Sequence, residues 1–212
     1  MLSDISQLLS RFDPATGEIA GAKVTCRHLL DLKGCFADVT AFAAAADKGN
    51  PLIYSVATVE RASGAGDLHF GIGRLMPGRI GREYYFTKGH MHSWREAAEI
   101  YVGISGEGEM LLEDHGNGDT HMVPLLPNCA VYVPGNTAHR TVNTGSSPLI
   151  YMGIYPAAAG HDYRAIAEQN FRCIVIQEGG RPVLRDRANL HALPDPSPLP
   201  RSRFKPTSKS TP

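Results

Sequence analysis

Three histidines and one glutamate near the middle of the chain have the residue types and spacing of metal ligands. His90 and His92 are separated by one residue, and residues two apart in a β-strand point to the same face. Glu99 begins the next apolar run, and His139 follows a later proline-glycine turn. Three imidazoles and one carboxylate suit Fe, Mn, Ni, Co or Zn better than Ca or Mg, which prefer all-oxygen sites. The sequence therefore predicts one metal site with positions left open for water or substrate.

Short β-runs separated by glycine and proline surround these residues. Many short strands with no helices between them predict an all-β fold, an antiparallel barrel or sandwich. The expected strands cover residues 52–58, 68–75, 82–86, 98–104, 109–113, 121–125, 130–133, 139–143 and 148–155, with a further strand at 173–179 after a short helical segment at 162–169.

The two ends of the chain differ from this pattern. Apolar spacing predicts a short helix over residues 3–12, which Pro14 ends because its ring disfavours helical geometry for Asp13. A second short helix is expected over residues 39–48, with Asp38 or Thr40 as its N-cap. Beyond residue 180 the chain is rich in Pro, Ser and basic residues. We therefore expect one domain over residues 1–180 and a disordered tail over residues 181–212.

Composition narrows the class of protein. The 212 residues suit one domain, and the 21 basic and 21 acidic side chains balance, which argues against nucleic acid as a partner. The four cysteines form no C-x-x-C pair, so we expect small buried or half-buried side chains. The N-terminus lacks the pattern of a signal peptide, and no segment is long enough to span a membrane, so we expect a cytoplasmic protein with no membrane partner.

The order of the motifs resembles the cupin superfamily. G-H-x-H-x6-E-x-Y is followed by G-x-G-x-M-L-L, by V-Y-V-P and by A-H-R-T-V-N-T-G. The T-K-G-H run that ends at His90 and the Y-P-A-A-A-G-H-D-Y run over residues 155–163 are more specific, and they resemble the cupin-type phosphoglucose isomerases of archaea and some bacteria. The likeness covers most of residues 13–180. It implies a cupin (jelly-roll) β-barrel, a homodimer, and interconversion of glucose 6-phosphate and fructose 6-phosphate with one divalent metal ion, Fe²⁺ first among Fe²⁺, Mn²⁺, Zn²⁺, Ni²⁺ and Co²⁺.

The chemistry of an aldose–ketose isomerase fits these residues. The reaction moves hydrogen between C1 and C2 of an open-chain sugar, so it needs a Lewis acid on the two oxygens and a group that carries the proton. Glu99 is a metal ligand, the proton carrier, or both, and the sequence leaves these alternatives open. The resemblance implies that Glu99, His139 and Tyr101 are catalytic. It also implies substrate binding, mainly at the phosphate end, by Tyr54, Thr87, Gly89, Tyr155, His161 and Tyr163.

One strand departs from the family pattern. Gly71-Ile72-Gly73 stands where the family often has threonine or serine, so a hydroxyl that contacts phosphate is expected to be missing there.

Two other functions would use the same metal ligands. A cupin-type dioxygenase would use the same ligands with O₂. A non-catalytic sugar-binding cupin would bind its ligand without turnover. The sequence contains no recognisable DNA-binding motif, which argues against a transcription factor of this kind.

Overall fold

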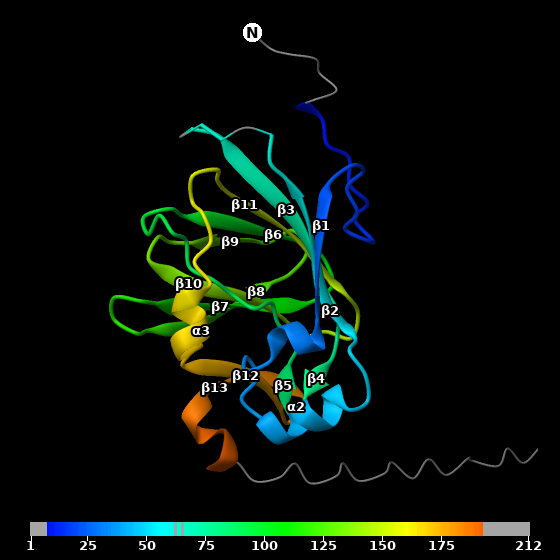
Figure 1. Ribbon diagram of the computed structural model, residues 1–212, viewed down its shortest axis with the longest axis vertical. Helices are drawn as coiled ribbons and strands as arrows, with labels where there is room; N and C mark the ends of the chain where they lie inside the picture. Colours follow the sequence, from blue (N-terminus) through cyan, green and yellow to red (C-terminus); the bar gives the residue numbers. More distant parts are fainter. Residues whose placement is uncertain (1–7, 62, 65, 193–212) are drawn as a thin grey trace, which may run out of the picture.

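The computed structural model describes residues 8–61, 63–64 and 66–192, and strands make up most of its regular structure (Figure 1). The strands are β1 (Lys23–His28), β2 (Leu52–Val59), β3 (Leu68–Leu75), β4 (Arg79–Ile80), β5 (Glu83–Tyr84), β6 (Glu99–Ser105), β7 (Gly108–Asp114), β8 (Thr120–Leu125), β9 (Ala130–Val133), β10 (Thr137–Asn143), β11 (Leu149–Pro156), β12 (Cys173–Glu178) and β13 (Arg181–Asp186). The helices are α2 (Val39–Ala46) and α3 (Arg164–Gln169), with 3₁₀ turns η1 (Leu29–Leu32) and η2 (Arg187–Ala192).

The strands form three antiparallel sheets. The six-stranded sheet has the order β1-β2-β3-β11-β6-β9, the three-stranded sheet has β10-β7-β8, and the four-stranded sheet has β13-β12-β5-β4. Figure 1 shows the first two sheets stacked as the walls of the barrel, with the third sheet and α2 at its lower end. This is the all-β cupin barrel that was predicted, and each predicted strand is present with its bounds shifted by a few residues.

The main core lies between the two larger sheets. Leu75 and Leu149 from the six-stranded sheet belong to the same buried cluster as Met110 and Val142 from the three-stranded sheet. Ile72 and Ile150 point away from this core and form a second cluster with Ile19. Successive strand residues thus alternate between two apolar clusters, one between the two larger sheets and one on the outer face of the six-stranded sheet.

The helical predictions had different outcomes. Helix α2 is confirmed: the Asp38 side chain caps it by accepting a hydrogen bond of 2.8 Å from the Ala41 amide. The helix predicted over residues 3–12 is wrong at its C-terminal end, because residues 9–12 are not helical and Phe12 forms a β-bridge with Ile19. That bridge satisfies backbone groups which a helix would have paired within itself. Residues 3–7 lie outside the described part of the chain.

The predicted tail begins too early. Residues 181–186 form β13, which pairs along its whole length with β12, so the ordered chain continues past residue 180. Pro182 lies in this edge strand, where a missing N–H is tolerated. The division of the chain into one domain and a tail stays a prediction. Residues 193–212 lie outside the described residues. No helix in the described ranges is long and apolar enough to cross a membrane.

Candidate metal centre and substrate cavity

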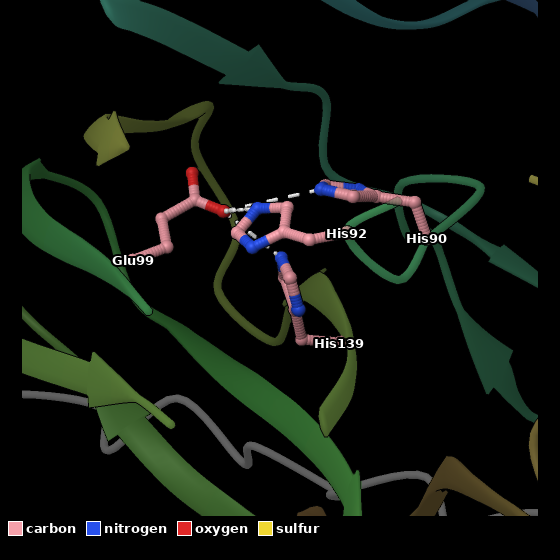
Figure 2. Close-up of side chains that lie close together, drawn as sticks. All are labelled: His90, His92, Glu99 and His139. Atoms are coloured by element: carbon pink, nitrogen blue, oxygen red, sulfur yellow. Dashed lines mark hydrogen bonds and ion pairs between the residues drawn. The ribbon is translucent and has the colours of Figure 1, made fainter. Parts of the chain in front are cut away.

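His90, His92, Glu99 and His139, here called the metal cluster, come together in the barrel (Figure 2). One ligand atom from each lies within 4.8 Å of the others. Oxygen Oε2 of Glu99 is 3.0 Å from Nε2 of His139, 3.2 Å from Nε2 of His92 and 3.9 Å from Nε2 of His90. Figure 2 shows the three imidazoles converging on this one oxygen from separate segments. The arrangement predicted from spacing is thus the geometry of a group that can hold a metal ion.

Different parts of the fold bring the four residues together. Glu99 is the first residue of β6 in the six-stranded sheet, whereas His139 lies in β10 of the three-stranded sheet. His90 and His92 lie in an extended segment between β5 and β6, held by a β-bridge between His90 and His139. Met91, between them, is 1% exposed and belongs to the main core. The alternation expected of a strand therefore places both imidazoles on one side without a regular strand.

Backbone carbonyls fix the orientation of two of the imidazoles. Nδ1 of His92 lies 2.9 Å from the Ala97 carbonyl, and Nδ1 of His139 lies 3.0 Å from the Thr137 carbonyl. Each Nδ1–H donates to its carbonyl, so Nε2 is the ring nitrogen left to face Glu99 and to bind a metal. Nε2 of His90 is buried with no hydrogen-bond partner among the described residues. A buried polar atom without a partner is unfavourable unless a ligand satisfies it, so the donor set fits a metal ion.

The protonation states of His90 and Glu99 agree with this fit. Burial, with the nearby His139, holds the pKa of His90 well below its usual value, so this imidazole is neutral. Burial raises the pKa of Glu99, but the hydrogen bond with His139 and the nearby imidazole of His92 outweigh burial and hold it well below its ordinary value. The cluster therefore presents a carboxylate, and at His90 a neutral imidazole, which are the forms that bind divalent metals.

The second oxygen of Glu99 faces the inner surface of β11. A Cβ atom placed on Gly153 would lie 2.7 Å from Oε1 of Glu99, so this oxygen occupies the space that a side chain would fill. Tyr101 hydrogen-bonds to the same carboxylate, and burial together with the charge of Glu99 raises the pKa of Tyr101 well above its usual value. Tyr101 is thus a neutral hydroxyl beside the metal cluster.

A cavity of about 240 Å³ opens over the metal cluster. Its walls include nearly all of the site residues predicted from the sequence: Tyr54, Thr87, Gly89, His90, Glu99, Tyr101, His139, Tyr155, His161 and Tyr163. The fold therefore brings the predicted metal ligands and the predicted substrate-binding residues into one space. Their individual roles remain proposals.

Tyr54, Thr87 and Gly89 lie together at one part of this cavity. The Tyr54 hydroxyl accepts a hydrogen bond of 3.4 Å from the Lys88 amide. Gly89 has φ of +78°, and a Cβ there would lie 2.8 Å from the Phe171 ring, so only glycine fits.

The Lys88 carbonyl accepts a 2.9 Å hydrogen bond from Arg140. Arg140 is buried, with its guanidinium 4.3 Å from the Phe86 ring centroid and 4.0 Å from that of Phe171. This packing holds the segment that carries Thr87 and Gly89.

His161 and Tyr155 lie nearer the metal cluster. The His161 ring is 4.5 Å from the His90 ring and 5.3 Å from the Tyr155 ring, measured between centroids. Burial lowers the pKa of His161, so its imidazole is neutral. Tyr163 stacks on His161 at 5.9 Å with an interplanar angle of 10°, and Lys88 lies 5.9 Å from its ring. Tyr163 therefore lies between the metal cluster and the part of the cavity near Tyr54.

The sequence reasoning missed several residues of the cavity wall. Arg27 lines the cavity from β1, and Tyr151 and Gly153 line it from β11. The alternation of β11 could have identified Tyr151 and Gly153, because both share a face with Tyr155. Arg27 gave no such signal, because the apolar pattern of β1 is weak and no strand was predicted there.

The strand with Gly71 and Gly73 lacks a side-chain hydroxyl on the cavity face, as the sequence indicated. The space at Gly73 is filled by another residue. A Cβ built on Gly73 would overlap the ring and the hydroxyl oxygen of Tyr151, its partner across β3 and β11.

Comparisons with known proteins agree on one family. A sequence model described as Glucose-6-phosphate isomerase (GPI) matches residues 26–192. A glucose-6-phosphate isomerase of Pyrococcus abyssi is 46% identical over 170 residues, covering 80% of this chain and 89% of that protein. One of Thermococcus kodakarensis is 48% identical over 168 residues, covering 79% and 88%.

A likeness to solved structures is weaker. The crystal structure of TT1209 from Thermus thermophilus is 18% identical to this chain, with a TM-score of 0.36. The match covers 48% of this chain and 82% of that one. The family match and the curated relatives cover most of both chains. This chain belongs to the glucose-6-phosphate isomerase family.

Proposed function

We propose that the protein is a metal-dependent aldose–ketose isomerase that interconverts glucose 6-phosphate and fructose 6-phosphate. The observation that carries this proposal is one cavity that joins a metal cluster to a wall of hydroxyl groups. The isomerisation needs a Lewis acid and a proton carrier at one end of the substrate and donors for a phosphate at the other. Both sets of groups lie in the same space of about 240 Å³.

His90, His92, Glu99 and His139 would hold the metal ion, for which we propose Fe²⁺, with Mn²⁺, Zn²⁺, Ni²⁺ and Co²⁺ as alternatives. The three imidazoles and one carboxylate support a transition metal over Ca²⁺ or Mg²⁺. When bound, the ion supplies Lewis acidity that polarises the C1 and C2 oxygens of an open-chain sugar.

Glu99 carries the proton between C1 and C2 in this proposal. Oε2 faces the three histidines while Oε1 lies over Gly153 in the cavity wall, so one carboxylate can hold the metal and still present a basic oxygen to the substrate. Its low pKa keeps it ionised at neutral pH, which is the form that can accept a proton. Tyr101 orients the carboxylate, His139 holds it from the opposite sheet, and the neutral imidazole of His161 binds a sugar oxygen.

The phosphate would bind at the part of the cavity that contains Tyr54, Thr87 and Gly89. Thr87 Oγ1 accepts from the Thr141 amide at 3.0 Å, which leaves its own O–H free to donate. Arg27, opposite Tyr54 across β1 and β2, supplies a positive charge there. Tyr163 and Tyr155 complete the binding wall toward the sugar.

A coupled assay of fructose 6-phosphate to glucose 6-phosphate tests this function. We expect turnover that a chelator abolishes and that added Fe²⁺ or Mn²⁺ restores. Glu99→Gln should lower kcat by about 10²- to 10⁴-fold, the contribution typical of a general base. The matched control is Glu109→Gln, which changes a carboxylate on β7 outside the cavity wall. No turnover by the metal-loaded protein, or oxygen uptake in its place, would contradict the isomerase and favour the dioxygenase.

We also propose a cytoplasmic homodimer. All four cysteines are free thiols, which supports a reducing compartment. Ile100 and Tyr132 face each other across β6 and β9 and are 41% and 63% exposed, which supports a contact on the outer face of that sheet. Light scattering of the purified protein tests the dimer, since a monomer at micromolar concentration would refute it.

A further inference from the structure

Gly73 is a bare position on the cavity face of β3, and the ring of Tyr151 covers it. The three atoms nearest to a Cβ built on Gly73 all belong to Tyr151, namely Cζ, the hydroxyl oxygen and Cε1. Gly73 does not have a positive φ, so its backbone would accept any L-residue. The ring of Tyr151 is therefore what excludes a side chain at residue 73.

The hydroxyl of Tyr151 reaches the neighbourhood of Thr87. Thr141, on β10, hydrogen-bonds to the Tyr151 hydroxyl through its side chain. Its amide donates to Thr87 Oγ1 at 3.0 Å. One residue thus contacts both hydroxyl groups, and the hydroxyl of Tyr54 lies near enough to influence the titration of Tyr151. The Tyr151 ring lies over Gly73 on β3, and its centroid is 5.6 Å from that of Tyr101 on β6.

The hydroxyl of Tyr151 is available as a donor. When the Thr141 hydroxyl donates to Tyr151 rather than to Sδ of Met110, 3.5 Å away, the Tyr151 O–H remains to donate into the cavity, because a phenol both donates and accepts. Burial raises the pKa of Tyr151, so this group stays protonated at neutral pH. Tyr151 is only 6% exposed, and a hydrogen bond to a charged acceptor is strong in such a site.

We propose that Tyr151 is a further substrate-binding residue whose hydroxyl donates to the phosphate of the sugar phosphate, and that Gly73 is bare in order to admit its ring. This inference rests on the proposed function. In this proposal Gly73 and Tyr151 act together, because Tyr151 on β11 places over Gly73 the hydroxyl that β3 lacks.

The first test is Tyr151→Phe, which removes only the hydroxyl. We expect KM for fructose 6-phosphate to rise about tenfold to hundredfold, the loss for one hydrogen bond to a charged group, while kcat changes less than about threefold. Affinity for 6-phosphogluconate, a carboxylate analogue of the open-chain substrate, should fall by the same factor, while affinity for gluconate, which lacks the phosphate, should not change. Tyr84→Phe, which removes the hydroxyl of an equally buried tyrosine outside the cavity wall, is the matched control and should behave as wild type.

The second test adds a side chain at residue 73. In Gly73→Ser the new Cβ overlaps the ring and displaces it, so we expect the same loss of affinity for 6-phosphogluconate as in Tyr151→Phe. In Gly73→Ser/Tyr151→Leu the serine hydroxyl takes the vacated position, and affinity should recover at least about threefold over Gly73→Ser. No recovery would count against the shared position.

Two results would overturn the inference while leaving the isomerase intact. One is an active wild type whose Tyr151→Phe variant keeps its KM and its affinity for 6-phosphogluconate. The other is an equal loss of affinity for 6-phosphogluconate and gluconate, which would assign the hydroxyl to the sugar. Failure of the proposed function is distinguishable, because the metal-loaded wild type would then show no turnover.

Discussion

Gly153→Ala tests whether the position of Glu99 limits the reaction. The new Cβ would lie 2.7 Å from Oε1, and ordinary contact begins at 3.4 Å, so the oxygen must retreat. The retreat is about 0.7 Å, and a misplacement of about 1 Å can reduce a rate by about 10²-fold. We therefore expect kcat to fall about tenfold to hundredfold. The backbone accepts alanine, because Gly153 does not have a positive φ.

The assay follows kcat and metal content together. Because Gly153→Ala removes no ligand, we expect metal analysis to give the same metal content per chain as wild type. KM should change little, since residue 153 lies beside Glu99 and not in the part of the cavity near Tyr54. The loss should therefore appear in kcat with the metal site filled.

Gly66→Ala is the matched control. It makes the same chemical change at a glycine with nothing within 4 Å of the added Cβ, so kcat should equal that of wild type. Wild-type kcat in folded, metal-loaded Gly153→Ala would refute the reasoning, because Oε1 would then not be held over residue 153. Loss of the metal would refute it as well, by showing that the carboxylate moves as a whole.

Three further predictions concern stability. Arg140→Met leaves the Lys88 carbonyl without its buried donor, so urea unfolding should show a loss of about 2–4 kcal/mol; an unchanged midpoint would contradict this. Burial raises the pKa of Glu83 from 4.5 to about 7, so the folded protein retains a proton that the unfolded chain releases. That stabilisation is complete below pH 4.5 and lost as pH rises through about 7, so Glu83→Gln should be more stable than wild type at pH 8 by on the order of 3 kcal/mol, with equal stability refuting the shift. Asp38→Ala should lower the free energy of unfolding by about 1 kcal/mol through loss of the α2 cap, and no change would show that the cap contributes nothing.

The local pattern of the chain determined much of the metal cluster. One residue between His90 and His92 places both imidazoles on one side of any extended backbone, and this held although the segment forms no regular strand. Glu99 follows His92 after a short connection, so its position near the two histidines also depends on residues that are close in sequence. Alternating apolar residues gave the strands of the barrel for the same reason, because period two depends on neighbours in sequence alone.

Other features depended on pairing between distant segments. β13 begins in a stretch of polar and basic composition, but its backbone hydrogen bonds with β12 order it. β1 has few apolar residues, and its pairing with β2 rather than its pattern makes it a strand, which brings Arg27 to the cavity. Composition predicts whether a segment can bury apolar surface, but it does not predict which partner supplies hydrogen bonds.

The sequence by itself determined which residues could hold a metal ion and which family pattern they follow. Only the tertiary structure decided how the cavity wall is completed. From the sequence, Gly73 indicates only that a hydroxyl is missing from this strand. In the structure, its cross-strand partner Tyr151 places a phenol over it. The physical reason is that a side chain's nearest neighbours in a sheet come from the adjacent strands, and the register between strands is fixed by the packing of the whole barrel.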